Sequence, residues 1–271
     1  MKFSGALHKM EVELDNPVQY RLQLGDSTLK VHELLGKKLR LSWQNTIHCI
    51  HCGRETRKSF NQGYCYPCFK MLAQCDICIV SPEKCHYDQG SCREPEWGRQ
   101  HCMQDHYIYL SNTSGVKVGI TRHTQIPTRW IDQGAVQALA VLKVSSRYNS
   151  GLVETAFKAY LNDKTNWRSM LKNDVSEQDL LHIFHTIWPQ VSLQLDELLR
   201  GDVTVVAEAE DLTDIQYPAL SYPDKISSFN LDKNPVIEDT LIAIKGQYLI
   251  FQQAVINIRK YAGYDVSLEI L

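Results

Sequence analysis

Residues 49–102 read CIHCGRETRKSFNQGYCYPCFKMLAQCDICIVSPEKCHYDQGSCREPEWGRQHC, and this stretch contains all nine cysteines of the 271-residue chain. Six of them form three C-x-x-C pairs, Cys49/Cys52, Cys65/Cys68 and Cys75/Cys78. A C-x-x-C turn points two sulfurs at one centre, and two such turns complete a tetrahedron around Zn²⁺. Twelve residues separate the first two pairs, a spacing typical of zinc ribbons and treble clefs. We therefore expect Cys49, Cys52, Cys65 and Cys68 to hold a zinc ion.

The remaining cysteines predict a second metal site whose ligands the sequence leaves open. Cys75 and Cys78 offer another pair, and its partners would come from Cys85, Cys92, Cys102, His86, His101 and His106. This set offers more donors than one tetrahedron needs, and connectivity cannot be deduced from spacing. Zinc is the default metal, but an iron–sulfur cluster also uses four cysteines. We expect about two metal ions per chain, with all nine cysteines as candidate ligands.

A disulfide framework is the alternative explanation of so many cysteines. A secreted protein would need a signal peptide, and the N-terminal run MKFSGALHKMEVELD lacks the required apolar core. Reduced thiols that hold metal suit the cytoplasm, which is the localisation we expect. The chain also lacks a run of about 18 apolar residues, so a membrane is not an expected partner.

Composition and charge limit how nucleic acid could bind. The chain is 44% hydrophobic and 22% charged, with a formal net charge of −2, which is ordinary for a soluble globular protein. It is therefore not a uniformly basic nucleic-acid coat, and any contact with phosphates must use local patches. One such patch lies between Tyr107 and Ile131, where Lys117, Arg122 and Arg129 occur without any acidic residue.

The pattern along the chain predicts an α+β protein with four segments. Residues 1–48 alternate as short strands, for example Val18 to Leu24, and residues 49–105 form the metal module. Residues 106–175 predict the order β-β-α-β-α. Residues 176–271 predict a helical linker, interrupted at Pro189, followed by a β-rich C-terminal part.

Residues 107–166 resemble the GIY-YIG nuclease superfamily, in the variant whose second motif reads K-[IV]-G-I-T. Five positions match its site: Tyr109 (with Tyr107 as the alternative register), Lys117, Arg129, Glu154 and Asn166. The whole chain also resembles an uncharacterised bacterial family, catalogued as a domain of unknown function, through the runs GYCYPCF, GSCREPEWG, KVGIT, PTRWIDQGA, TNWR and KGQYLIF. The chain departs from the GIY-YIG pattern because the tyrosine of the second motif is absent.

The GIY-YIG resemblance implies phosphodiester hydrolysis at a site that contains a divalent ion. Glu154 would hold Mg²⁺ or Mn²⁺, Arg129 and Lys117 would stabilise the developing negative charge, and Tyr109 or His106 would act on a proton. Each residue also has a structural explanation. Glu154 could face solvent, Arg129 could stack on Trp130 or bridge to Asp132, and Asn166 could cap the helix that begins at Trp167.

Three functions remain open from the sequence. The first is a zinc-containing protein that binds, and as a GIY-YIG-like enzyme cleaves, DNA or RNA. The second is a nucleic-acid-binding module without catalysis. The C-terminal strands could present Tyr248, Phe251, Arg259 and Lys260 to single-stranded nucleic acid, unless the two aromatic residues are core. The third is a metal-dependent scaffold or sensor.

Overall fold

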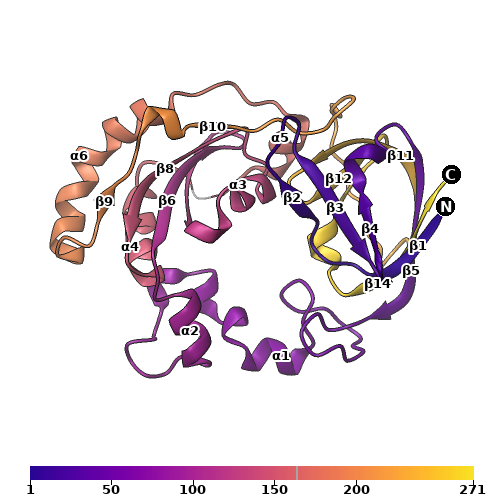
Figure 1. Cartoon of the computed structure of the whole chain (residues 1–271), viewed down its shortest axis with the longest axis horizontal. Coiled ribbons are helices and arrows are strands. Elements are labelled where there is room, and N and C mark those ends of the chain that lie inside the picture. The colour runs from indigo at the N-terminus through magenta and orange to yellow at the C-terminus, as the bar shows by residue number, and fades with distance from the viewer. Residues whose placement is uncertain (163) are drawn as a thin grey trace.

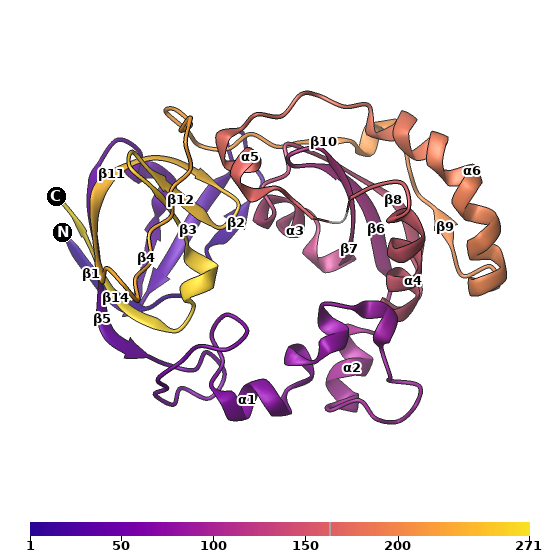
Figure 2. The same ribbon diagram turned by 180° about the vertical axis from the view of Figure 1, so that it is seen from behind.

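The computed structural model describes residues 1–162 and 164–271. The fold is mixed α and β, with a β-rich C-terminal part, and the chain forms a ring (Figure 1). A body of β-strands from both ends of the chain occupies one side of the ring, and a second sheet with its helices occupies the other. The cysteine-rich module runs below and joins them, as the reverse view also shows (Figure 2).

The β-rich body contains one six-stranded sheet in the order β1-β14-β5-β11-β12-β13, and each of these neighbours pairs antiparallel. These strands span Lys2–Ala6 (β1), Tyr264–Ile270 (β14), Lys38–Ile47 (β5), Val236–Lys245 (β11), Tyr248–Phe251 (β12) and Val255–Asn257 (β13). A three-stranded sheet packs with it, formed by Glu11–Glu13 (β2), Gln19–Leu24 (β3) and Ser27–Lys30 (β4). Residues 1–48 and 236–271 therefore share one structural unit.

The alternation predicted for the N-terminal strands is confirmed. Val18, Tyr20, Leu22 and Leu24 are all buried, and the residues between them are more exposed. A strand with period two buries one face and leaves the other toward solvent. These side chains form one core with the inward faces of β5, β11 and β14.

The second sheet follows the predicted β-β-α-β-α order. Its elements are His106–Asn112 (β6), Val116–Arg122 (β7), Thr128–Asp132 (α3), Gln137–Val144 (β8) and Arg147–Phe157 (α4). The sheet order is β10-β8-β6-β7, with β9 also on β8, where β9 is Thr204–Val205 and β10 is Thr213–Asp214. Adjacent residues of β6 face opposite sides of the sheet. Ile108 and Leu110 pack with α4, whereas Tyr109 packs with α3 and joins the core of the β-rich body.

Helix α6 (Leu180–Leu199) corrects the prediction that Pro189 divides this segment. Pro189 lies on the exposed side, and the buried positions continue past it from Phe184 and Ile187 to Val191 and Leu195. Because both halves pack in the same core as β6 and β8, tertiary packing maintains one helix despite the hydrogen bond that proline cannot make. Within the described residues, no helix is long and apolar enough to cross a membrane.

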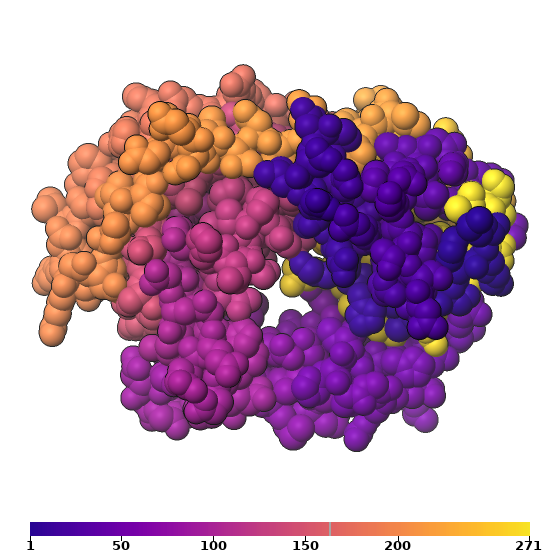
Figure 3. All heavy atoms as spheres, viewed as in Figure 1, coloured from indigo at the N-terminus to yellow at the C-terminus, as the bar shows by residue number. Residues whose placement is uncertain are grey.

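The cysteine-rich module consists of short helices and turns. It contains Tyr66–Met71 (α1) and Pro95–His101 (α2), and the single-turn 3₁₀ helices Ala73–Cys75 (η2), Ile77–Ile79 (η3) and Pro82–Lys84 (η4). Helix α5 (Trp167–Lys172) lies on the other side of the ring, near β12. The remaining 3₁₀ helices span Val31–Leu34 (η1), His123–Gln125 (η5), Ala209–Asp211 (η6) and Ile258–Tyr261 (η7). The space-filling view shows an opening in the middle of the ring, between the module and the two bodies above it (Figure 3).

The division into four segments stays a prediction. The strand pairing adds one fact to it, namely that the first and last segments complete each other's sheet.

Candidate functional site

The first four cysteines form a compact cluster. Strand β5 ends at Ile47, just before Cys49 and Cys52, and α1 places Cys68 one turn beyond Cys65. Their sulfurs all lie within 4.8 Å of one another, and the Cys52 and Cys65 sulfurs are 3.7 Å apart. A tetrahedral zinc site with Zn–S bonds of about 2.3 Å requires sulfur–sulfur distances of about 3.8 Å. The cluster is therefore compatible with a zinc ion.

The environment of this cluster favours a thiolate at Cys49. Burial raises the pKa of the Cys49 thiol, but backbone N–H groups of Cys52, Cys65 and His51 lower it to about 6. Burial and the neighbouring cysteines instead raise the pKa of Cys68. In a cluster without metal the protons are thus unevenly shared, and a bound cation would favour deprotonation of all four thiols.

The predicted Cys75/Cys78 pair is divided between two places. Cys75 is buried in a small core with Cys49, Cys65 and Cys68. Cys78 lines a different, small cavity together with Cys85, Cys92 and Cys102. The side chains of Asp76 and His86 also reach that cavity.

A cleft rich in arginine lies between the three parts of the ring. One cavity of about 410 Å³ and a second of about 650 Å³ share Arg122, Arg129 and Arg147. The larger one also contacts the β-rich body, through Lys9 and Arg259, and the cysteine-rich module. Glu154 is the one acidic residue among the described residues that line either cavity. The cleft therefore gathers positive charge that the net charge of the chain does not reveal.

One face of α4 forms a wall of this cleft. Arg147, Gly151, Glu154 and Lys158 recur at helical spacing, so they lie along one side of the helix and its C-terminal end. Gly151 contacts η4 so closely that an added Cβ would lie 2.4 Å from the backbone nitrogen of Glu83. This close packing holds the cysteine-rich module against α4.

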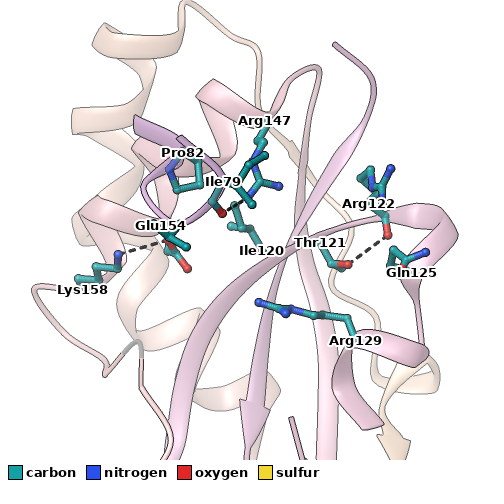
Figure 4. Close-up of a pocket in the computed structure, with 11 residues that line it drawn as sticks. Ile79, Pro82, Ile120, Thr121, Arg122, Gln125, Arg129, Arg147, Glu154 and Lys158 are labelled. Carbon is teal, nitrogen blue, oxygen red and sulfur yellow. Dashed lines mark hydrogen bonds and ion pairs between the residues drawn. The ribbon is translucent and has the colours of Figure 1, made fainter. Parts of the chain in front are cut away.

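Arg147 and Arg129 approach the smaller cavity from different elements (Figure 4). The Arg147 guanidinium donates a hydrogen bond of 2.6 Å to the carbonyl of Ile79, which belongs to the module. Burial lowers the pKa of Arg147, and the charges of Arg129 and Arg122 lower it further. These arginines are therefore close enough to repel one another.

Glu154 faces the same cavity and makes an ion pair of 3.2 Å with Lys158 (Figure 4). Its side chain is 14% exposed, so it is not the solvent-facing glutamate of the structural alternative. Asp132, which the other alternative assigned to Arg129, instead pairs with Lys9 at 2.9 Å.

Tyr109 and Lys117 lie beneath the cleft rather than in it. Both are buried, and both donate hydrogen bonds to the side-chain oxygen of Gln133, at 2.9 Å and 2.7 Å. Burial raises the pKa of Tyr109, although Arg129 lowers it and Glu154 raises it. Tyr109 is thus within electrostatic reach of both cleft residues. Gly119 faces Tyr109 across the hairpin, and an added Cβ there would lie 2.5 Å from the tyrosine oxygen.

Asn166 and His106 have structural roles. Asn166 caps α5, since its side chain accepts hydrogen bonds from the N–H groups of Arg168 and Ser169. His106 is buried, its Nδ1 contacts the carbonyl of Gln104 at 2.7 Å, and burial lowers its pKa to about 4. Neither residue lines the arginine-rich cavities.

Arg147 was missed as a site residue, and the sequence grouped Arg259 with Tyr248 and Phe251 rather than with the cleft. Arg147 starts α4, at seven residues before Glu154, so the same helical spacing that places Glu154 could have found it. Arg259 follows β13 in η7 and lines the cleft, whereas Phe251 is core and Tyr248 stacks on Trp167. No local pattern in the sequence connects Arg259 with Arg129.

A family model described as "Protein of unknown function (DUF2797)" matches residues 36–266. This range includes every cysteine, the β-β-α-β-α segment and the strands β5, β11, β12 and β13 of the β-rich body. Neither the curated proteins nor the solved structures include a significant match.

Proposed function

The chain belongs to the DUF2797 family, and from the geometry of its site we propose that it is a zinc-containing protein that binds nucleic acid. The arginine-lined cleft would hold the phosphate backbone. The first cysteine cluster would hold structural zinc and connect β5 to the module that closes the cleft.

The observation that carries this proposal is the convergence of three arginines, from β7, α3 and α4, on adjoining cavities. Arginine stays charged at any physiological pH, and its planar group matches phosphate oxygens. Like charges held together in a partly buried site repel one another, and an anionic ligand would relieve that repulsion. A polyanion can contact several of them at once, which favours nucleic acid over a single small anion.

The binding test uses labelled single-stranded and double-stranded DNA and RNA. We expect affinity to fall steeply with salt. Arg129→Ala should weaken binding about tenfold across sequences and reduce the salt slope by about 1. Arg21→Ala is the matched control, because Arg21 is an exposed arginine paired with Glu13 on the three-stranded sheet. No binding at low salt, or equal losses in the two variants, would exclude the cleft as a nucleic-acid site.

Phosphodiester hydrolysis by a GIY-YIG-like domain is the second candidate function. It is supported by Arg129 and Glu154, which line one cavity above Tyr109 in a β-β-α-β-α frame. Glu154 would hold Mg²⁺ or Mn²⁺, which accepts one carboxylate together with water and phosphate oxygens; Lys158 now shares that carboxylate. The ion would supply charge stabilisation at the phosphate.

Residues of the chain would have separate roles in this hydrolysis. Arg129 and Arg147 would orient the phosphate and stabilise its developing charge. Burial raises the pKa of Tyr109, so its hydroxyl stays protonated at neutral pH and donates to Gln133. Tyr109 is therefore not suited to act as the base.

Glu154→Gln separates cleavage from binding, because it removes a charge and preserves shape. With Mg²⁺ or Mn²⁺ present, we expect strand cleavage to fall by about two to four orders of magnitude, while binding is retained or improved. Glu177→Gln, an exposed acid outside the cleft, is the control. Equal cleavage by all three proteins would indicate another active site, and binding without cleavage by any of them would leave only the first proposal.

A further inference from the structure

Four cysteines outside the first cluster surround one small enclosed space. Cys78 lies in η3, Cys85 follows η4, Cys92 precedes α2 and Cys102 follows α2. All four line a cavity of about 10 Å³, which is close to the space that a single water-sized occupant needs. The spacings between these cysteines are irregular. The folded loops and α2 therefore bring them together, and a local C-x-x-C motif does not.

Helix α2 brings Cys92 and Cys102 to this cavity. An added Cβ on Gly98 would lie 3.1 Å from the Cys92 sulfur, so the thiol packs directly on the helix. The backbone N–H of Cys102 donates a 2.7 Å hydrogen bond to the carbonyl of Gly98, which fixes the other end of the same turn.

Asp76 and His86, which approach Cys78 to within 4.8 Å, offer a competing set of ligands. Asp76 is already engaged, because it pairs with Arg93 at 2.6 Å and accepts a hydrogen bond from the N–H of Ile77. His86 contacts the Ser91 hydroxyl at 2.9 Å through Nδ1 and lies 3.6 Å from Asp76 through Nε2. The four thiols have no comparable partners in the described hydrogen bonds and ion pairs, and four thiolates are a common complete ligand set for structural zinc. Unlike the first cluster, their sulfurs do not all lie within 4.8 Å of one another, so an ion in the shared cavity would draw them together.

We propose that Cys78, Cys85, Cys92 and Cys102 bind a second zinc ion, and that this site positions Arg147 in the cleft. The backbone N–H of Arg147 donates a 2.8 Å hydrogen bond to the carbonyl of Cys102. Its guanidinium donates to the carbonyls of Ile79, at 2.6 Å, and Cys78, at 3.5 Å. Two of the four ligand residues therefore hold both ends of this arginine. The second zinc site does not depend on the proposed function. The role of this site in nucleic-acid binding, through Arg147, does rest on the proposed function.

Metal content tests the ligand set. Wild-type protein purified without added metal should contain about two zinc ions per chain, and Cys92→Ser and Cys85→Ser should each retain about one. His86→Gln and Cys75→Ser should retain both, because these residues lie outside the proposed set. Loss of one zinc in His86→Gln would show that Asp76, Cys78 and His86 bind it instead of the proposed ligands. Loss of one zinc in Cys75→Ser would show that the Cys75/Cys78 pair binds it. One zinc or fewer in wild type would overturn the second site.

Cobalt substitution of the wild-type protein covers the case in which the cysteine variants do not fold. Two equivalents of Co²⁺ should each produce the charge-transfer absorption of four thiolates. A second equivalent with the weaker absorption of one thiolate would contradict the proposed site.

A double-mutant cycle tests the connection with Arg147, using the oligonucleotide that wild type binds. Cys92→Ser and Arg147→Ala should each weaken binding about tenfold, and the double variant should be no weaker than Arg147→Ala by more than about twofold. Additive losses would contradict the positioning role while leaving the zinc site intact. If wild type binds no oligonucleotide, the position of Arg147 can be measured by NMR. The side-chain nitrogen signal of Arg147 reports its 2.6 Å hydrogen bond to the carbonyl of Ile79. This signal should shift in Cys92→Ser and not in His86→Gln.

Discussion

The arginine-lined cleft and the interior of the β-rich body both keep positive charge away from bulk water, by different means. In the cleft, Arg147 and Arg259 have pKa values that burial lowers, and they share adjoining cavities with other arginines. In the β-rich body, Lys245 is fully buried. Its ammonium donates a 2.6 Å hydrogen bond to Asn173 and lies 5.2 Å from the ring centre of Tyr217.

The difference lies in how each group can respond to burial. Arginine does not release its proton in a protein, so the charge in the cleft persists. Lysine can become neutral, and burial lowers the pKa of Lys245 to about 7. The cleft therefore keeps its positive charge, which the proposed binding of nucleic acid requires, whereas Lys245 is accommodated within the fold by local contacts.

The largest expected effect is that of Lys245→Met on the way the free energy of unfolding changes with pH. The pKa of Lys245 falls from 10.5 to about 7 on folding, so between these values the unfolded chain binds more protons than the folded one. The free energy of unfolding of wild type should thus rise with pH, by about 3 kcal/mol from pH ~7 to pH ~9.5. Lys245→Met should be more stable than wild type near pH 7 and should lack this rise.

Urea unfolding at a series of pH values measures this effect, with Lys260→Met, an exposed lysine on η7, as the control. The window ends below pH ~10 because the buried Tyr217, whose pKa is raised by burial, opposes the trend above that value. If the free energy of unfolding of wild type and that of Lys245→Met change with pH in parallel, Lys245 keeps its proton in the folded protein. Lys245 would then not differ from the arginines in its response to burial.

The sequence predicted the first metal cluster because its ligands come as two local pairs. A C-x-x-C turn is a short-range structure, so Cys49, Cys52, Cys65 and Cys68 could be assigned without knowing the fold. The same rule does not distinguish Cys75 from Cys78, although Cys75 packs in the small core of the first cluster and Cys78 lines the second cavity. Cys75 ends the 3₁₀ helix η2 and Cys78 lies in the next one, η3, an arrangement that the C-x-x-C spacing does not reveal.

Strands and helices of the second sheet were also predicted, because their periodicity is local. The cleft was not, because Arg147, Arg129 and Arg259 are neighbours only once the ends of the chain join in one sheet and the module bends back across the ring. The resemblance selected Arg129 and Glu154, which the structure places in one cavity with Tyr109 beneath. It also selected Asn166, whose side chain caps α5. Sequence order alone does not show which matched residues face the same space.

The smallest expected effect concerns the repulsion between the arginines of the cleft, measured as the stability of the protein without ligand. If Arg122 is held beside Arg129 and Arg147 at an electrostatic cost, then Arg122→Gln should stabilise the free protein, by about 0.5 kcal/mol at low salt. The gain should vanish in about 1 M salt, where the Debye length is about 3 Å. Thermal unfolding at both salt concentrations provides the measurement.

Arg57→Gln is the matched control for this small effect, since Arg57 is an exposed arginine of the module outside both cavities. It should change stability little at either salt concentration. An oligonucleotide should reverse the order, because it stabilises whichever protein binds it more tightly, and wild type has one more phosphate contact to offer. A destabilised Arg122→Gln at low salt would mean that a partner within the chain already balances Arg122. The cleft would then resemble the surroundings of Lys245, with its charge contained by the fold and no anion required.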